Sequence, residues 1–276
     1  MAFILAGLTS LLYGFCDFAG GLATRRASVL AVTLWANVVG LGIAVIISAI
    51  HHVVIGDSPT VADLTWGLAS GVAGVGGLAM YFQGMAKGQM AVVAPVSAVT
   101  LAVVPLLFGV ATGERYGISS WVGVAVALPA LWLTVQQRTD HQRPGKAIYG
   151  LAAGLIFSLF LIGIAQTSPD AGFWPLVAVR VGGLTLLAFI MGARRTSPTL
   201  PRRARPLAFL AGGDILANLT YLLAVRIGPF GLVAVVSSFY PVVIALLARF
   251  VERERMSPTR ILGLTLSMVS LVLITL

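Results

Sequence analysis

Residues 93–97 read VAPVS, and residues 233–237 read VAVVS. When the chain is shifted by 140 residues, segment 81–133 lies over segment 221–273 without a gap. The other matches include polar residues and glycines: Tyr81 with Tyr221, Gly88 with Gly228, Glu114-Arg115 with Glu254-Arg255, and Gly123 with Gly263. Chance easily produces apolar matches in an apolar chain, whereas a repeated Glu-Arg pair and repeated glycines indicate an internal duplication.

The composition of the chain is too apolar for a protein that folds in water. Of its 276 residues, 58% are hydrophobic and 10% are charged, and the mean hydropathy is +0.99. A soluble protein carries about 25% charged residues. We therefore expect a multi-pass protein of the cell membrane whose outer face contacts the lipid bilayer.

Ten segments are long and apolar enough to cross a membrane, which takes about 20 residues. They cover residues 2–22, 28–50, 63–85, 90–112, 117–136, 147–165, 172–192, 206–225, 229–250 and 258–276. The first segment starts at Met1 without a basic leader, and we expect it to stay in the protein as a membrane helix. The predicted fold class is an all-α membrane protein with ten transmembrane helices.

The duplication divides these helices into two sets of five. The first repeat covers residues 1–136, the second covers 147–276, and a short basic linker covers 137–146. Because five is an odd number, the second repeat enters the bilayer in the opposite orientation. Inverted repeats of this kind are typical of secondary transporters, which bind their solute near the midplane between the repeats. Prolines inside the spans predict kinks: Pro95, Pro105, Pro129 and Pro241.

Several other functions are disfavoured by the sequence. The net charge of +9 comes from Lys and Arg residues that lie mostly between apolar runs, which fits a membrane-orientation signal better than nucleic-acid binding. The single cysteine, Cys16, excludes an intrachain disulfide, and the spacing of the three histidines is poor for zinc. The glycine-rich stretch 71–77 lacks the Gly-Lys-Ser/Thr of a nucleotide-binding loop. We expect no cofactor, no metal and no nucleic-acid partner.

Ionisable residues inside membrane spans are the first candidates for function, because a charge at a helix centre costs about 2.5–3.5 kcal/mol. Three such residues are Asp17, Arg180 and Asp214. Arg180 lies near the middle of its span, where two roles are open: it binds an anionic group of a substrate, or it forms a structural ion pair with Asp17 or Asp214. For Asp17 the alternatives are proton coupling and a helix-end or ion-pair role.

A polar stripe follows Asp214. Asn218 and Tyr221 lie four and seven residues further on, so the three side chains share one helix face. This pattern predicts that they line a water-filled cavity, with interhelical hydrogen bonding as the alternative. Secondary candidates, for which packing is the alternative, are Trp35, Asn37, Gln83, Ser97, Ser237 and Tyr240.

The order of these features resembles that of a known family. The stretch Tyr13-Gly14-Phe15-Cys16-Asp17-Phe18 in the first span, the Gly-Glu-Arg at 113–115, Arg180 in the seventh span, and the matched Glu114 and Glu254 together resemble the EamA-type branch of the drug/metabolite transporter superfamily. The resemblance extends over nearly the whole chain. It departs from the family pattern at Arg253, which stands where the second repeat would match Gly113. The resemblance implies transport of metabolites, amino acids or drugs without ATP.

The combined prediction is a secondary transporter that moves a small organic solute by alternating access, with coupling to protons as one form of energy input. The alternatives are an integral membrane enzyme and a channel. Most Lys and Arg residues follow the odd-numbered spans, so the positive-inside rule places both termini outside the cell. The family resemblance implies cytoplasmic termini instead, and we follow the charge distribution.

Overall fold

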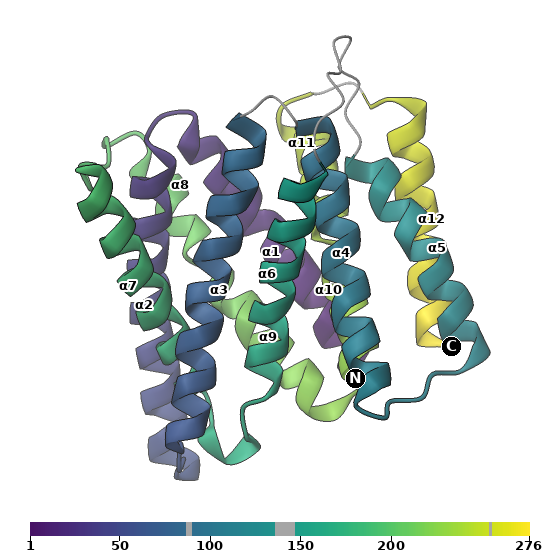
Figure 1. The fold of residues 1–276 in the computed structure, drawn as a ribbon, viewed down its shortest axis with the longest axis horizontal. Coiled ribbons are helices and arrows are strands. Elements are labelled where there is room, and N and C mark those ends of the chain that lie inside the picture. The colour runs from purple at the N-terminus through teal and green to yellow at the C-terminus, as the bar shows by residue number, and fades with distance from the viewer. Residues whose placement is uncertain (87–89, 136–146, 254–255) are drawn as a thin grey trace.

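The protein folds into a bundle of roughly parallel and antiparallel helices (Figure 1). The computed structural model describes residues 1–86, 90–135, 147–253 and 256–276. Within these ranges the helices are α1 (Ala2–Thr24), α2 (Val29–Ile55), α3 (Val61–Ala86), α4 (Met90–Ala111), α5 (Ile118–Val135), α6 (Ile148–Ala165), α7 (Trp174–Arg194), α8 (Arg205–Ala211), α9 (Asp214–Ile227), α10 (Phe230–Ser237), α11 (Tyr240–Val251) and α12 (Pro258–Thr275). The linker 137–146 and three of the repeated positions, Gly88, Glu254 and Arg255, lie outside the described residues.

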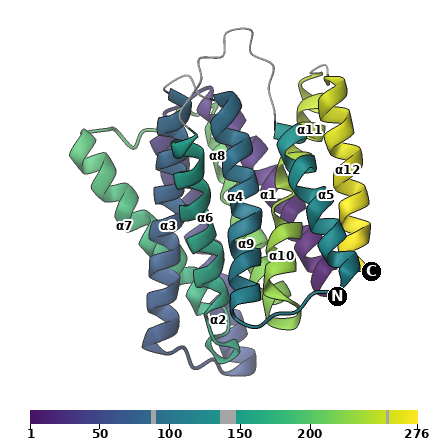
Figure 2. The ribbon, with the colours of Figure 1, turned by 45° about the vertical axis from the view of Figure 1, so that its right-hand side comes forward.

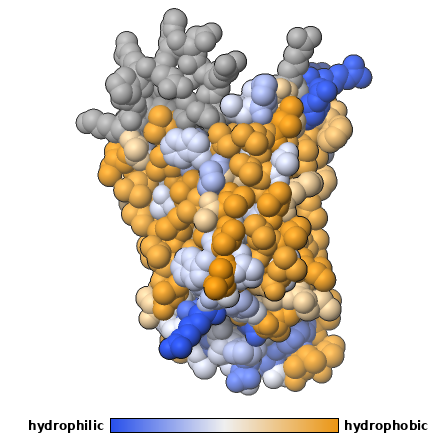
Figure 3. All heavy atoms as spheres, turned by 90° about the vertical axis from the view of Figure 1, so that its right-hand side faces the viewer, coloured by the Kyte–Doolittle hydropathy of each residue, from blue (hydrophilic) through white to orange (hydrophobic). Residues whose placement is uncertain are grey.

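The helices have the length and composition of membrane spans. In the described part of the chain, nine helical stretches are apolar and long enough to cross a bilayer, two of them made of the pairs α8–α9 and α10–α11. The 26-residue helix α3 runs beside them as the tenth predicted span. Strongly hydrophilic residues gather toward the two ends of the molecule, and apolar side chains cover most of the surface between them (Figure 3). The fold class predicted from the sequence is confirmed.

The two repeats have matching helix boundaries and opposite directions. α4 begins at residue 90 and ends at 111, and the pair α10–α11 begins at 230 and ends at 251, 140 residues later in both cases. The helices α5 and α12 show the same shift. Both chain termini lie at one end of the bundle, so α1 runs away from this end whereas α6 runs toward it (Figures 1 and 2). We call this the terminus end.

The opposite end of the bundle carries a group of arginines, and we call it the arginine end. Its members in the described loops and helix termini are Arg25, Arg26, Arg194, Arg195, Arg202, Arg203, Arg205, Arg249, Arg253 and Arg260. The loops 25–28 and 195–204 join helices at this end. The terminus end carries the loops 56–60 and 166–173 and the arginines Arg115 and Arg226.

The repeats interlock, because each one sends its first helix into the other. Helix α1 packs against α8, α9, α10 and α11 of the second repeat, and α6 packs against α3 and α4 of the first. The matched helices α5 and α12 also pack along each other. The two repeats therefore contact each other along α1, along α6 and along the α5–α12 pair, as a site between repeats requires.

Two of the predicted spans are broken in the middle. The eighth span is interrupted at Gly212 and Gly213, between α8 and α9, and the ninth at Ser238 and Phe239, between α10 and α11. Pro241 occupies the first turn of α11, where N–H groups have no acceptor within the helix, so its missing N–H costs no helical hydrogen bond. By contrast, α4 and α5 continue as helices through their internal prolines. The sequence did not predict the break at the two glycines.

The second span is longer than predicted. It was expected to end at residue 50, but α2 continues to Ile55 and closes at Gly56, whose left-handed backbone (φ 86°) caps the helix. The extension carries His51 and His52, which are polar residues suited to the membrane surface. The remaining predicted boundaries lie within a few residues of the observed helices.

Toward the terminus end, α3 and α7 approach each other very closely. A Cβ atom at Gly71 would overlap the carbonyl oxygen of Val179, and one at Gly182 would overlap that of Leu68. A Cβ at Gly67 would lie 2.5 Å from the carbonyl oxygen of Pro175. Small residues permit such backbone contact between membrane helices. This crossing closes the gap between the repeats in the half of the bundle near the terminus end.

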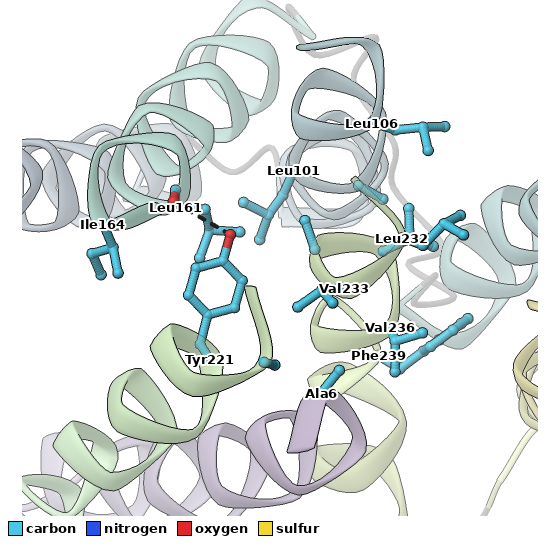
Figure 4. Close-up of a cluster of buried hydrophobic side chains, with 14 of the residues drawn as sticks. Ala6, Leu101, Leu106, Leu161, Ile164, Tyr221, Leu232, Val233, Val236 and Phe239 are labelled. Atoms are coloured by element: carbon cyan, nitrogen blue, oxygen red, sulfur yellow. Dashed lines mark hydrogen bonds between the residues drawn. The ribbon is translucent and has the colours of Figure 1, made fainter. Parts of the chain in front are cut away.

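A cluster of buried apolar side chains fills the same half of the bundle. It includes Ala6 from α1, Leu101 from α4, Leu161 from α6, and Tyr221 from α9. Figure 4 shows these side chains converging with Leu232, Val233, Val236 and Phe239, which follow one another along α10 and its break. Because both repeats contribute, the cluster seals the seam between them.

Candidate functional site

The site begins with an ion pair between α7 and α9. An Nη atom of Arg180 donates a hydrogen bond of 2.8 Å to Oδ1 of Asp214, the first residue of α9. The other Nη atom donates to Oδ1 of Asn37 on α2 over 3.3 Å. Helix α9 begins at Asp214 directly after the break, and the hydrogen bond places this residue beside Arg180 of α7. Of the two roles left open for Arg180, the geometry supports an ion pair, with Asp214 as the partner.

The Arg180 guanidinium is held inside the protein. Only 4% of the residue is exposed, and a Cβ atom at Gly40 would lie 2.9 Å from its Nε. Gly40 therefore leaves room for the side chain to pass against α2. The Asp214 side chain, in contrast, is 28% exposed. The pair thus consists of an enclosed cation and a carboxylate that borders accessible space.

A second polar contact connects α1 to α9. The hydroxyl of Tyr13 donates a hydrogen bond to Oδ1 of Asn218. Asn218 is 2% exposed, so this carbonyl oxygen has little access to water and requires such a partner. Together, these contacts fix α9 against α1 on one side and against α7 on the other.

Asp17 lies where the inner face of α1 becomes accessible. Residues 6, 10, 13 and 17 share one face of the helix by their spacing. Along this face Ala6 is 0% and Ser10 5% exposed, Tyr13 is half-buried, and Asp17 is exposed. The face of α1 that is sealed near the terminus end is therefore open to solvent toward the arginine end.

Asp17 does not point toward lipid. The outward stripe of α1 consists of Ile4, Leu8, Leu11 and Phe15, which are 41–70% exposed. At 100° per residue, Asp17 lies on the opposite side of the helix from this stripe. Its exposure therefore indicates accessible space on the inner side of α1.

Three half-buried tyrosines surround this space, and we call them the tyrosine group: Tyr13 on α1, Tyr81 on α3 and Tyr240 on α11. Each lies close enough to feel the charge of the Asp17 carboxylate. The Asp214 carboxylate is also within range of Asp17. The rings of Tyr13 and Tyr240 meet edge to face, with centroids 6.3 Å apart. Tyr240 was predicted from the sequence as a secondary candidate. Tyr13 and Tyr81 were not predicted as site residues, although Tyr13 lies in the family-like stretch and Tyr81 in the repeat.

Tyr221 lies on the sealed side of the site. It is 0% exposed, and its hydroxyl donates to the carbonyl oxygen of Leu161 over 3.3 Å (Figure 4). Of the predicted stripe on α9, Asp214 borders the accessible space, whereas Asn218 and Tyr221 are buried. The repeat matches Tyr221 with Tyr81. Tyr221 is fully buried, whereas Tyr81 is half-buried beside the accessible space.

The secondary candidates are dispersed. Trp35 donates from Nε1 to the carbonyl oxygen of Pro198 over 2.9 Å, which joins α2 to the loop after α7. Ser97 and Ser237 are buried, at 4% and 2% exposure. Gln83 is exposed near the end of α3. None of these four contacts the Arg180–Asp214 pair through a hydrogen bond between described residues.

Comparison with known proteins places the chain in a family. The model of the EamA-like transporter family matches it twice, over residues 1–136 and 145–276. The chain belongs to the EamA-like transporter family. One similar solved structure, described only as the crystal structure of a protein, superimposes with a TM-score of 0.76 over 98% of this chain and 94% of that chain, at 16% identity. No curated protein matches the chain. At this identity the likeness to the solved structure concerns the fold alone.

In this EamA-like protein, the loops of the two repeats are tied together at the terminus end. The Asp63 carboxylate accepts hydrogen bonds from the backbone N–H of Thr60 (2.9 Å) and from that of Ser168 (2.7 Å). Arg226, near the end of α9, donates to the carbonyl oxygens of Ser168 (2.9 Å) and Gly172 (2.8 Å). We call these contacts of Asp63, Ser168 and Arg226 the loop latch. The latch holds the α6–α7 loop against α3 and α9.

The first copy of the Glu-Arg pair also contributes, through Glu114, at the terminus end of this EamA-like fold. The Glu114 carboxylate accepts hydrogen bonds from the backbone N–H groups of Phe230 and Gly231, the latter over 2.9 Å. These are the first residues of α10, whose N–H groups have no partner within the helix. The hydroxyl of Tyr116 donates to the same carboxylate. Glu114 thus caps a helix of the other repeat.

Proposed function

We propose that this membrane transporter is a secondary active carrier of a small organic solute that works by alternating access. The observation that supports the proposal is the change in exposure along the inner face of α1, from fully buried Ala6 to exposed Asp17. A space between the repeats that is open at one end and sealed at the other has the form of one state of such a carrier.

The terminus end of the bundle is closed by contacts that would have to open in the second state. The seal consists of the α3–α7 crossing, the buried apolar cluster and the loop latch, and all of them join one repeat to the other. Because the repeats are inverted copies, exchanging their conformations would open the terminus end and close the arginine end. By the charge distribution, the arginine end faces the cytoplasm, so the described state is the inward-open one.

Asp17 is the residue that we assign to proton coupling. It is a carboxylic acid in the middle of a membrane protein, and it is accessible from one side. The Asp214 carboxylate lies within electrostatic range of Asp17, and closure of the arginine end would remove Asp17 from water. A carrier whose acid takes up a proton on one side and releases it on the other couples solute movement to the proton gradient.

Two other functions give different expectations. A channel would conduct without exchange, whereas a carrier shows counterflow, in which solute on one side accelerates labelled solute from the other. A membrane enzyme would need converging acids or histidines at one face. Acids and a histidine do approach one another at the terminus end, where a ring nitrogen of His51 lies 2.6 Å from Oδ1 of Asp57. The Asp63 carboxylate there is already bound by the backbone N–H groups of Thr60 and Ser168. The described residues contain no group of three or more acids, histidines or cysteines placed to hold a metal ion.

The experiment uses the purified full chain in liposomes. Vesicles loaded with a mixture of amino acids and amines, together with an internal pH dye, receive an acid or alkaline exterior, and mass spectrometry records which solutes move. We expect counterflow and a matching proton flux, with the flux abolished in Asp17→Asn. Asp170→Asn removes the same charge from an exposed position at the terminus end and serves as the control. Solute movement without counterflow would favour a channel, and solute movement unaffected by Asp17→Asn would contradict the coupling role.

A further inference from the structure

The accessible part of the site has a distinct charge, because its one enclosed cation is already neutralised. Arg180 donates to Asp214 and to Asn37, and 4% of the residue is exposed. An anionic substrate that used Arg180 would have to displace the Asp214 carboxylate. Arg180 therefore contributes little positive potential to the space beyond the pair.

Asp17 adds a negatively charged side chain to that space. Among the ion pairs of the described residues, none involves Asp17. Its side chain is exposed on the inner face of α1, and the Asp214 carboxylate lies within range of its charge. An approaching anion is repelled by Asp17, whereas an approaching cation gains a direct partner.

The tyrosine group supplies the second part of a cation site. Its members reach the Asp17 region from α1, α3 and α11, and all three are half-buried, which leaves part of each side chain accessible. The face of an aromatic ring carries negative electrostatic potential and attracts ammonium groups. A carboxylate together with several tyrosine rings is the combination that recognises organic amines.

We propose that this site takes an organic cation as its substrate: an amine whose ammonium group binds the Asp17 carboxylate and whose apolar part lies among the tyrosine group. The Arg180–Asp214 pair positions α7 against α9 and does not contact the substrate. The inference rests on the proposed transport function and specifies the chemical class that is carried.

The test compares three probes that share one phenol ring and differ in charge. They are tyramine, a cation; L-tyrosine, a zwitterion; and 3-(4-hydroxyphenyl)propionate, an anion. Binding to the purified full chain in detergent is measured by titration calorimetry near neutral pH. We expect tyramine to bind at least about tenfold more tightly than the anion, the ratio that one strong charged contact provides.

Matched variants identify the groups responsible. Asp17→Asn should weaken tyramine binding about tenfold or more, and Asp17→Glu should retain a measurable part of it, whereas the control Asp170→Asn should leave it unchanged. Tyr81→Phe keeps the ring face and should bind nearly normally. Tyr81→Leu removes the ring and should bind about three- to tenfold more weakly. If Asp17→Asn does not fold, Asp17→Glu and the two Tyr81 variants carry the test.

Several results would overturn the assignment. They are tighter binding of the anion than of tyramine, no detectable binding of tyramine at millimolar concentration, or a tyramine affinity in folded Asp17→Asn within twofold of the unaltered chain. The same probes in liposomes separate this inference from the transport function. Tyramine binding without counterflow contradicts transport and leaves the cation site standing. Counterflow of the anion with no binding of tyramine contradicts the cation site and leaves transport standing.

Discussion

Arg180 of α7 meets Asp214 directly after the break in the eighth span, with 2.8 Å between an Nη atom of the arginine and Oδ1 of the aspartate. The two partners differ in their surroundings, since 5% of the Arg180 side chain and 28% of the Asp214 side chain are exposed. Losing one partner is therefore expected to have different consequences from losing the other.

Removing the acid should destabilise the protein more than removing the base. In Asp214→Ala the Arg180 guanidinium remains buried without its carboxylate partner. We expect a loss of about 3 kcal/mol, the lower end of the range for breaking a buried pair. In Arg180→Ala the remaining carboxylate still reaches water, so the loss should be smaller. Thermal unfolding in detergent measures both.

A double variant provides the control for this prediction. Arg180→Met combined with Asp214→Asn removes both charges, and it should unfold at a higher temperature than Asp214→Ala alone. A double variant that is less stable than Asp214→Ala would show that the pair does not act as a unit.

The α3–α7 crossing predicts that Gly71 cannot be enlarged. Gly71→Ala places a methyl group against the carbonyl oxygen of Val179, so the two helices must separate. We expect a loss of about 1–3 kcal/mol and slower counterflow, because the seal near the terminus end no longer forms properly. On the same helix, a Cβ at Gly76 would have its nearest neighbour at 3.7 Å, an ordinary contact. Gly76→Ala is therefore the control, and equal effects of the two changes would contradict the role of the crossing.

The fold was largely predictable because its determinants are local or repeated. Runs of apolar residues define the spans, and the matched positions from Tyr81 to Gly263 define the duplication. The break at Gly212 and Gly213 was not predictable in this way. Two glycines in a membrane span are compatible with close helix packing as well as with a helix break. The break is recognised only in the folded structure, where Asp214 directly after it contacts Arg180.

The candidate site was predictable in its charged members and less so in its environment. Asp17, Arg180 and Asp214 were predicted as site residues because burying a charge in lipid is costly. Which charges pair depends on how α7 meets α9, and this lies beyond any local pattern. Tyr81 and Tyr221 demonstrate the limit most directly, because the repeat matches them although Tyr81 is half-buried and Tyr221 is fully buried.

Glu114 should stabilise α10 through its N-terminus. Glu114→Ala leaves the N–H groups of Phe230 and Gly231 without their acceptor, and we expect a loss of about 1 kcal/mol. Glu114→Gln keeps one acceptor oxygen but loses the charge that favours a helix N-terminus, so its effect should be intermediate. The adjacent Arg115 is exposed, and Arg115→Ala should have no effect on the unfolding temperature. An unfolding temperature of Glu114→Ala equal to that of the unaltered protein would exclude the capping role.

The loop latch should control access to the terminus end. Asp63→Ala removes the acceptor that joins the N–H groups of Thr60 and Ser168, so the α6–α7 loop is released from α3. A cysteine introduced at fully buried Ala224, in a Cys16→Ser background, reports on opening through its reaction with a membrane-impermeant maleimide. We expect faster labelling when Asp63→Ala is added. Thr65→Ala alters an exposed hydroxyl two residues along the same helix and should leave the rate unchanged.

The matched tyrosines provide a last test, because they carry the same side chain in opposite environments. Tyr221→Phe removes a buried hydrogen bond to the carbonyl oxygen of Leu161, with an expected cost of about 0.5–1.5 kcal/mol. Tyr81→Phe removes a hydroxyl that is half-buried beside accessible space, and its effect on stability should be close to zero. If the protein is trapped with its terminus end open, the order should reverse, because exchanging the repeat conformations buries Tyr81 and exposes Tyr221. The same order in both states would mean that the two repeats do not exchange conformations.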